Sequence, residues 1–364
     1  MKNDKSEEDE IPQLQRPPSP PPHTTFATRQ IHPPSFSAFK PRDYRFTGQA
    51  RSMSHVAWSC DGKRIAAVGL DKMARVWNAD KQVRVCLEPR LATLYSGTHT
   101  DEVNYVSWNP THPDMFCTSS VIDRRIVFWD ARQKSRSITH VTVPHGPIMT
   151  NYSPDGKHLL YTYYKPATDE DRIAQYQVSF LTNRGTNDWQ MMSTPTTKGS
   201  RGIFSNAGDA VIVAHTGIHS LDVYNFPETS HFETVSAHVG GSTSIAMDPR
   251  GRYLASGGLD AIVNLFDLDE WICARTVTSC DHSINTVSFS FDGEYLAMAT
   301  AGSYIDICAT ETAAPLHRVA TPGPAPTVAW HPSQHAIAYC SKPKVGRENP
   351  ASAFAYVSTF GVME

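Results

Sequence analysis

Histidine, serine and aspartate residues recur together at two places in the chain, and this combination of side chains can form a nucleophilic triad. The two sets are His99, Ser119 and Asp123, and His238, Ser256 and Asp260. Nothing in their spacing supplies an oxyanion site or an exposed nucleophile, which acyl transfer also needs. A buried hydrogen-bond network is the alternative, with the indole N–H of Trp129 as a further donor in the first set. We therefore expect both sets to be structural, and the second to be weaker because Phe266 replaces the indole.

Two pairs of histidines are spaced four residues apart, which is a zinc-ligand spacing when both residues lie on one face of a helix. The pairs are His215 and His219, and His331 and His335. Each pair flanks a predicted turn between strands, and no cysteine or acidic residue completes a ligand set, so we expect surface-loop histidines. The sequence also contains no phosphate-binding glycine loop. We expect no catalytic residue, no metal and no cofactor.

The elements that carry these residues repeat seven times along the chain. Equivalent positions in the seven units are Trp58, Trp108, Tyr152, Phe204, Met247, Phe289 and Trp330. Successive positions are 50, 44, 52, 43, 42 and 41 residues apart. A propeller blade of four antiparallel strands takes about 40 to 45 residues, so the excess in the long units is assigned to loops.

Within each unit, short apolar runs are separated by turn residues such as Asp61-Gly62 and Asp292-Gly293, which favour hairpins. A second run of small and apolar residues follows the turn, and a third ends in an aromatic residue and a polar one, as in Trp129-Asp130. No stretch of ten to fifteen residues has helical periodicity. The sequence therefore predicts an all-β fold, a seven-bladed WD40 β-propeller.

The first 42 residues differ in composition from the rest of the chain. Nine prolines follow residue 10, and residues 16–22 read RPPSPPP. We predict a disordered proline-rich tail over residues 1–42 and a single propeller domain over residues 43–364. The lone strand predicted at residues 43–48 (DYRFTG) would supply the outermost strand of the last blade and close the ring. A polar insertion at residues 341–352 is predicted to be a surface loop.

Composition and charge restrict the class of partner. The formal net charge of −3 provides no basic field of the kind that autonomous nucleic-acid binders use, so RNA or DNA binding by the propeller alone is disfavoured. No apolar run approaches the eighteen residues needed to cross a bilayer, and the polar, acidic first ten residues predict no signal peptide. Seven cysteines without a Cys-x-x-Cys pair fit a reducing compartment.

One short motif has a competing functional meaning. Trp129, Asp130 and Arg132 form the Trp-Asp-x-Arg pattern, which resembles the box that propeller receptors of cullin-type ubiquitin ligases use to grip their adaptor. Many unrelated WD40 blades end in the same way. A substrate receptor of a cullin-type ligase is therefore kept as the alternative function.

The detail of the units extends beyond a general WD40 repeat. The segments that carry it are HVAWSCDGKRIAAVGLDKMARVW (residues 55–77), DPRGRYLASGGLDAIVNLFDLDEWICAR (residues 248–275), VSFSFDGEYLAMAT and VAWHPSQHAIAY. From about residue 46 to residue 360 the chain resembles the THO complex subunit 3 family, the WD40 subunits of the THO/TREX assembly. The resemblance is weaker in the third and fourth units, where residues 161–178 replace a short hairpin.

The resemblance implies a non-enzymatic nuclear subunit that helps to couple transcription and messenger RNA processing to export. In that family the propeller docks on the large helical scaffold subunit of THO, and the complex recruits a DEAD-box RNA helicase and export adaptors. Expected partners are therefore proteins, with RNA contacted only indirectly or through the N-terminal tail, and no membrane.

Residues beside the aspartates of the turns between second and third strands face one end of a propeller. They are Leu70, Lys72, Ile122, Arg124 and Leu259. As a mixed apolar and basic ring they are candidate partner-binding residues, and ordinary turn residues are the alternative.

Overall fold

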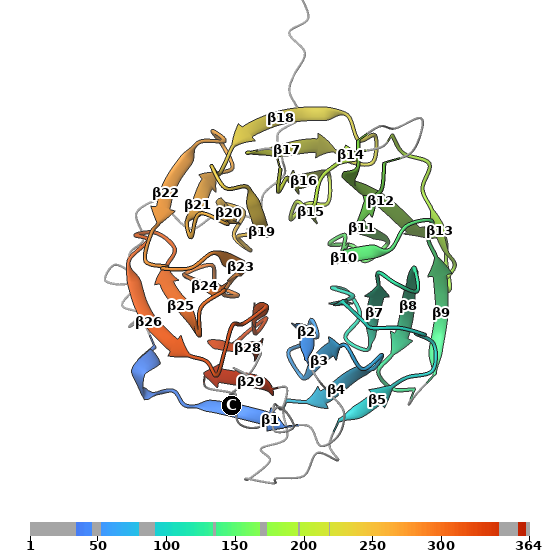
Figure 1. The fold of residues 1–364 in the computed structure, drawn as a ribbon, viewed down its shortest axis with the longest axis horizontal. Helices are drawn as coiled ribbons and strands as arrows, with labels where there is room; N and C mark the ends of the chain where they lie inside the picture. The colour runs from blue at the N-terminus through green and yellow to red at the C-terminus, as the bar shows by residue number, and fades with distance from the viewer. Residues whose placement is uncertain are drawn as a thin grey trace, which may run out of the picture.

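The computed structural model describes residues 34–45, 52–79, 92–133, 136–167, 173–195, 197–217, 219–341 and 356–361. They form seven antiparallel sheets around a common axis, as the ring in Figure 1 shows. The only helical element in these ranges is the short 3-10 helix η1 (Phe36–Ala38), and the described residues contain no helix fit to span a membrane. The predicted all-β, seven-bladed fold is confirmed.

The seven blades follow one another along the chain. The first contains β2 (Met53–Trp58), β3 (Arg64–Gly69), β4 (Ala74–Asn78) and β5 (Thr93–Tyr95). The second contains β6 (Tyr105–Trp108), β7 (Met115–Ser120), β8 (Arg125–Asp130) and β9 (Ser137–Thr142). The third contains β10 (Pro147–Tyr152), β11 (His158–Lys165), β12 (Gln175–Asn183), β13 (Trp189–Met191) and β14 (Thr197–Lys198).

The remaining four blades keep the same plan. The fourth contains β15 (Arg201–Phe204), β16 (Ala210–Ala214), β17 (Ser220–Asn225) and β18 (His231–Ser236). The fifth contains β19 (Ser242–Met247), β20 (Tyr253–Gly258), β21 (Val263–Asp267) and β22 (Cys273–Val277). The sixth contains β23 (Ile284–Phe289), β24 (Tyr295–Thr300), β25 (Tyr304–Ala309) and β26 (Pro315–Ala320). The seventh contains β27 (Thr327–Trp330), β28 (Ala336–Ser341), β29 (Tyr356–Gly361) and β1 (Pro41–Arg45).

The Asp-Gly turns between first and second strands are held by a serine. Ser59 Oγ donates to Asp61 Oδ1 at 2.6 Å and accepts a hydrogen bond from the Arg64 amide at 3.0 Å. Gly62 completes the turn with φ 71°, and a Cβ there would lie 2.2 Å from the His331 ring of the last blade. This turn therefore requires glycine both for its conformation and for the close approach of the neighbouring blade.

The hydrophobic core lies between blades. In the described residues, seven buried clusters each join one blade to the next around the ring. Tryptophans on the innermost strands add hydrogen bonds across these junctions: Trp58 Nε1 donates to Ala329 O at 3.1 Å, and Trp108 Nε1 donates to Ala57 O at 3.2 Å. Each blade is therefore stabilised mainly by its two neighbours.

The ring is closed by its two ends, as predicted. β1 pairs antiparallel with β29, from Pro41 opposite Phe360 to Arg45 opposite Tyr356, and Figure 1 shows the two strands side by side. Ser358 Oγ donates to Asp43 Oδ1 at 2.6 Å across this pair. β29 is therefore paired on both sides, and β1, from the start of the chain, forms the outer edge of the blade that contains the end of the described chain.

The folded region begins before residue 43, which corrects the predicted boundary. Phe36 in η1 is 5% exposed and packs edge-on against Tyr295, with ring centroids 5.2 Å apart. Phe39 packs against Phe360 at 5.6 Å. The flanking prolines gave this segment the composition of a tail, whereas its two phenylalanines anchor it to the last two blades. The rest of the predicted tail, residues 1–33, lies outside the described residues, as do residues 46–48 of the closing strand.

The third blade departs from the four-strand plan, where the sequence resemblance is also weaker. β11 and β12 form a long hairpin, and β13 and β14 pair with opposite ends of β12. Residues 168–172 within this hairpin lie outside the described residues. So do residues 342–355, which contain most of the predicted polar insertion of the last blade.

Candidate protein-docking face

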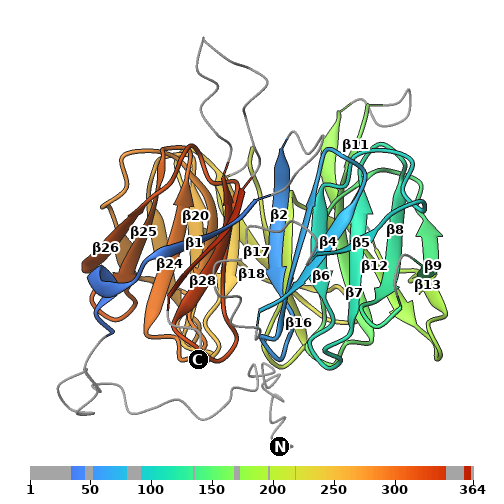
Figure 2. The same ribbon diagram turned by 90° about the horizontal axis from the view of Figure 1, so that it is seen from below.

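The ends of the propeller carry different connections. One end carries the turns between the second and third strands together with the links from one blade to the next, and we call it the connection face; it is uppermost in Figure 2. The other end, the opposite face, carries the remaining turns of each blade. Because strand order is the same in all blades, equivalent turn residues from different blades gather on one face.

Three of the candidate partner-binding residues present apolar side chains on the connection face. Leu70, Ile122 and Leu259 are 43%, 57% and 55% exposed. Each is followed by an aspartate and then by a residue with positive φ: Lys72 at 66°, Arg124 at 58° and Ala261 at 64°. The left-handed residue reverses the chain within the turn and leaves the residue before the aspartate at its outer tip.

In two of these three turns, the aspartate side chain accepts a hydrogen bond from the backbone that follows it. Asp123 Oδ1 accepts a hydrogen bond from the Arg125 amide at 2.9 Å, and Asp260 Oδ1 accepts one from the Ile262 amide at 3.2 Å. Ile122 and Leu259 therefore stand on turns whose backbone is fixed by a side chain, whereas Asp71 of the first blade pairs with the Arg75 side chain. The basic candidates are partly engaged, since Lys72 Nζ donates to Thr100 O at 2.7 Å.

Asp123 also belongs to the first polar network. His99 Nδ1 lies 2.8 Å from Asp123 Oδ2, and His99 Nε2 lies 2.7 Å from Thr118 Oγ1. Trp129 Nε1 donates to the same hydroxyl at 2.8 Å. An ionised carboxylate only accepts, so His99 Nδ1–H donates to Asp123 and Thr118 donates to Nε2. Burial alone would raise the pKa of Asp123, but the hydrogen bond from His99 holds it below the ordinary value.

The hydroxyl in this network is that of Thr118 and not that of Ser119, which corrects the predicted set. Ser119 Oγ is buried and has no hydrogen-bond partner among the described residues. Neighbouring residues of a strand point to opposite sides, and Thr118 is on the side that faces both the histidine and the indole. Within the described part of the chain, no serine hydroxyl is hydrogen-bonded to the His99 ring.

The second network brings together the three residues singled out in the sequence. His238 Nδ1 lies 3.1 Å from both carboxylate oxygens of Asp260, and His238 Nε2 lies 3.0 Å from Ser256 Oγ. Ser242 Oγ lies 3.0 Å from Ser256 Oγ. Phe266 replaces the indole and donates nothing. The His238 side chain is fully buried, so this set is enclosed in the blade.

Several exposed apolar residues of the connection face were missed in the sequence. They are Val121, Tyr164, Ile173, Tyr176 and Val239, with exposed fractions of 36%, 47%, 76%, 39% and 86%. Tyr164 and Tyr176 face each other on the third-blade hairpin with ring centroids 5.2 Å apart. Val239 could have been found from its place in a link between blades, three residues after a strand ends. The apolar surface therefore extends over the first, second, third and fifth blades.

Arg132, the end of the Trp-Asp-x-Arg motif, lies on the opposite face. Its side chain is 61% exposed, and its Nε and Nη2 donate to Asp130 at 2.9 and 2.7 Å. The hydrogen bond from Arg132 holds the pKa of Asp130 below the ordinary value. The guanidinium is thus bound within its own blade while remaining accessible from solvent.

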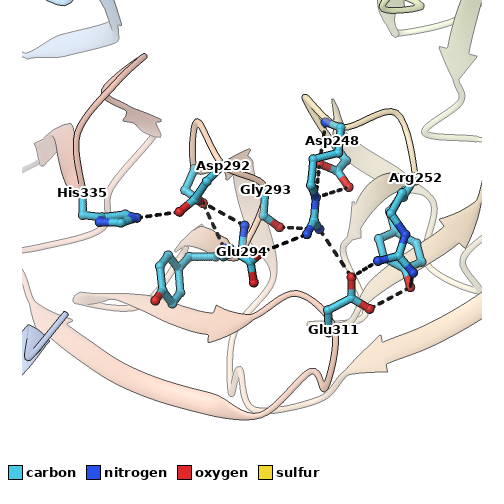
Figure 3. Close-up of polar contacts among 11 residues, drawn as sticks. Asp248, Arg252, Asp292, Gly293, Glu294, Glu311 and His335 are labelled. Carbon is cyan, nitrogen blue, oxygen red and sulfur yellow. Dashed lines mark hydrogen bonds and ion pairs between the residues drawn. The ribbon is translucent and has the colours of Figure 1, made fainter. Parts of the chain in front are cut away.

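The opposite face also carries an ionic network across the fifth, sixth and seventh blades (Figure 3). Arg250 is its centre: Nε lies 3.2 Å from Asp248 Oδ1, Nη1 lies 3.1 Å from Glu294 Oε1, and Nη2 lies 3.6 Å from Glu311 Oε1. Arg252 also pairs with Glu311. The network joins turns of neighbouring blades, so its geometry is that of a structural link.

The histidine pairs do not form metal sites. His215 and His331 are buried rather than placed in surface loops, which corrects the prediction: His215 Nε2 pairs with Asp222 at 2.8 Å, and His331 Nε2 lies 3.1 Å from Gly62 O. His335 Nε2 pairs with Asp292 Oδ2 at 2.8 Å. Among the described residues, no group of three histidine, cysteine or acidic side chains could hold a metal ion.

Comparison with known proteins identifies the repeat of this chain. The WD domain, G-beta repeat family matches residues 42–78, 90–130 and 229–267. Each match begins in or just before the outermost strand of one blade and ends with the third strand of the next, which is the offset that lets β1 close the ring. The chain is a seven-bladed WD40 propeller.

The WD40 propeller is similar to several known proteins. It is 28% identical to THO complex subunit 3 of Arabidopsis thaliana over 86% of this chain and 93% of that protein. It is 25% identical to WD repeat-containing protein AAC3 of Dictyostelium discoideum over 92% of this chain and 71% of that protein. The resemblance to THO complex subunit 3 found in the sequence is confirmed.

Solved structures support the fold. The β-propeller domain of Cps50 (Swd1) from Myceliophteria thermophila superimposes with a TM-score of 0.69, covering 89% of this chain and all of that one. The two sequences are 14% identical, so this likeness shows the WD40 propeller architecture and nothing about partners.

Proposed function

We propose that this WD40 propeller is a non-enzymatic scaffold subunit of a THO/TREX-type complex in the nucleus, where it couples transcription to messenger RNA processing and export. It acts by docking proteins on its connection face. The similarity to THO complex subunit 3 over nearly the whole of both chains supports the kind of complex. The proposed direct partner is the large helical scaffold subunit, and a DEAD-box RNA helicase and export adaptors associate indirectly.

The observation that carries the proposal is the concentration of exposed apolar side chains on the connection face. Eight of the large apolar side chains that are exposed in the described residues lie on the connection face, among them Leu70, Ile122 and Leu259. A soluble surface rarely gathers apolar side chains on one side unless a partner covers them. Because Asp123 and Asp260 fix their turns, docking there orders little of the chain and keeps most of the burial energy as affinity.

The test replaces Leu70, Ile122 and Leu259 together by glutamate. The tagged variant and wild type are purified from nuclear extract with ribonuclease present, and the bound proteins are identified by mass spectrometry. The variant should lose the helical THO subunits, because three buried charges would be left unpaired in the interface. Its urea unfolding midpoint should stay near that of wild type, because all three sites are exposed.

A matched control changes three apolar residues of similar exposure away from the connection face. Leu94, Ile272 and Leu316 are 45%, 54% and 38% exposed, and their replacement by glutamate should leave the recovered subunits unchanged. Equal recovery of the helical THO subunits with both triple variants would exclude the connection face as the docking surface. Recovery of a cullin adaptor that Arg132→Ala abolishes would replace the proposal by the ubiquitin-ligase alternative.

A further inference from the structure

The centre of the ring encloses a cavity of about 820 Å³ lined by the innermost strands of all seven blades. Its wall consists of backbone, aliphatic and aromatic side chains, hydroxyls and amides. Among the lining residues, all within the described part of the chain, Arg201 is the only arginine, lysine, aspartate or glutamate. One positive charge is therefore set in an otherwise neutral wall.

Arg201 lies at the end of the cavity next to the connection face. It is the first residue of β15 and pairs with Ala214, the last residue of β16, just before a turn of that face. Tyr105 is the first residue of β6 and pairs with Ser119 near the end of β7, so it lies at the same level in the second blade. Both side chains line the cavity.

The guanidinium of Arg201 is held in place without a counter-charge. Nε donates to Thr243 O at 2.9 Å and Nη1 donates to Ser200 O at 3.0 Å, so two backbone carbonyls orient the group. No carboxylate in the described residues forms an ion pair with it. Burial lowers the pKa of Arg201, and the groups that act against that shift are the phenols of Tyr105 and Tyr176 rather than a carboxylate. A guanidinium has five N–H donors, so donors remain for a ligand.

Tyr105 offers a second donor in the same space. Its ring stacks on that of His55 with centroids 3.7 Å apart, and its hydroxyl makes no hydrogen bond to any described residue. Burial is the main cause that raises the pKa of Tyr105, and the charge of Arg201, which lines the same cavity, acts against it. Burial lowers the pKa of His55 to about 3, so the imidazole is neutral at neutral pH.

We propose that Arg201 and Tyr105 form a carboxylate-binding site at the mouth of the central cavity, and that it receives an acidic side chain of a protein docked on the connection face. The inference rests on the proposed function and adds a polar contact at the centre of the apolar docking surface. A guanidinium and a phenol together match the two oxygens of a carboxylate. A nucleic acid is disfavoured because backbone recognition neutralises several phosphates, and the cavity offers a single cation.

The experiment selects a library of random twelve-residue peptides on the full-length protein. Wild type should select peptides with an aspartate or glutamate at one fixed position among apolar residues. In a selected peptide, replacement of the acidic residue by its amide should weaken binding to wild type about tenfold to hundredfold. The same replacement should have little effect on binding to the Arg201→Gln variant, because that variant lacks the charge that binds the carboxylate.

Further variants separate a binding role from a structural one. Tyr105→Phe removes only the free hydroxyl and should weaken acidic peptides several-fold, whereas Arg201→Lys should retain the preference for an acid. Arg132→Gln, the same charge change on the opposite face, should select the same peptides as wild type. These variants keep the test informative if Arg201→Gln is poorly folded.

Three results would overturn the inference. Peptides without a fixed acidic residue, or an equal loss with the amide peptide on wild type and Arg201→Gln, would show that Arg201 reads no carboxylate. Binding of a labelled twelve-nucleotide uridine RNA that Arg201→Gln abolishes would assign the charge to phosphate instead. If any of these results occurs while the Leu70, Ile122 and Leu259 triple variant still loses its partner, the docking face is retained and only the carboxylate-binding site is rejected.

Discussion

Replacement of Arg250 by alanine is the sharpest test of how neighbouring blades are held together. The Arg250 side chain is 10% exposed, and two of its carboxylate partners, Asp248 and Glu294, are 0% and 9% exposed. Its Nη2 also donates to Gly293 O at 2.7 Å (Figure 3). The substitution therefore leaves two nearly buried carboxylates facing each other without the cation between them.

The expected loss in free energy of unfolding is about 3–5 kcal/mol, since removing one partner leaves a buried charge without its counter-charge. It should also depend on pH. Burial raises the pKa of Asp248 in the native protein while Arg250 acts to lower it, so the variant raises this pKa further. A carboxyl group with a raised native pKa binds protons preferentially in the folded state, and its destabilising effect decreases as pH falls. The deficit should be larger at pH 7 than at pH 5.

The assay is urea unfolding followed by tryptophan fluorescence at both pH values. Arg275→Ala is the matched control: Arg275 is exposed and donates its Nε to the Glu311 carbonyl at 3.1 Å, so its loss should cost less than about 1 kcal/mol. Adding Asp248→Asn to Arg250→Ala should recover part of the deficit. A loss below about 1 kcal/mol, or a deficit that grows as pH falls, would refute the assignment of Arg250 as a buried structural link.

Two other substitutions test the polar network and the ring closure, each read by the urea unfolding midpoint. Thr118→Val leaves His99 and the Trp129 indole without their shared hydroxyl and should cost about 1–3 kcal/mol, whereas Ser119→Ala removes an unpartnered hydroxyl and should be nearly neutral. A larger loss of stability with Ser119→Ala than with Thr118→Val would show that Ser119, and not Thr118, supplies the hydroxyl of the network. Phe36→Ala should cost about 3–5 kcal/mol because Phe36 is 5% exposed in the core of the last two blades, and an unchanged midpoint would place it outside the fold.

The propeller could be predicted from the sequence because its repeat has a regular length and turn chemistry. Turns such as Asp61-Gly62 mark the same point in several units, and short separations such as that of Met247 and Phe289 set the size of a blade. The lone strand before the first unit then had one place to pair, beside β29. Blade number and closure follow from these regularities because each blade needs a neighbour on both sides.

Residue-level contacts were harder to predict, for a reason that β7 illustrates. Five consecutive residues from Phe116 to Ser120 are buried, because blades pack on both faces of the sheet. Without alternation of apolar and polar residues, nothing in the sequence shows which of Thr118 and Ser119 faces His99. Arg201 was missed for a related reason: an arginine at the start of a strand looks like a solvent-exposed end, and only the closed ring turns it toward a cavity.

The described turns between second and third strands differ from blade to blade in the residue that they expose. Where a blade has an aspartate in this turn, as at Asp123 and Asp260, the preceding residue is exposed and apolar. In the sixth blade, Gly302 takes the place of the aspartate and Ala301 the place of the apolar residue. A protein docked on the connection face, as proposed, should therefore contact the first, second, third and fifth blades and leave this turn of the sixth blade uncovered. Glutamate at Ala301 should accordingly leave the recovery of the helical subunits unchanged.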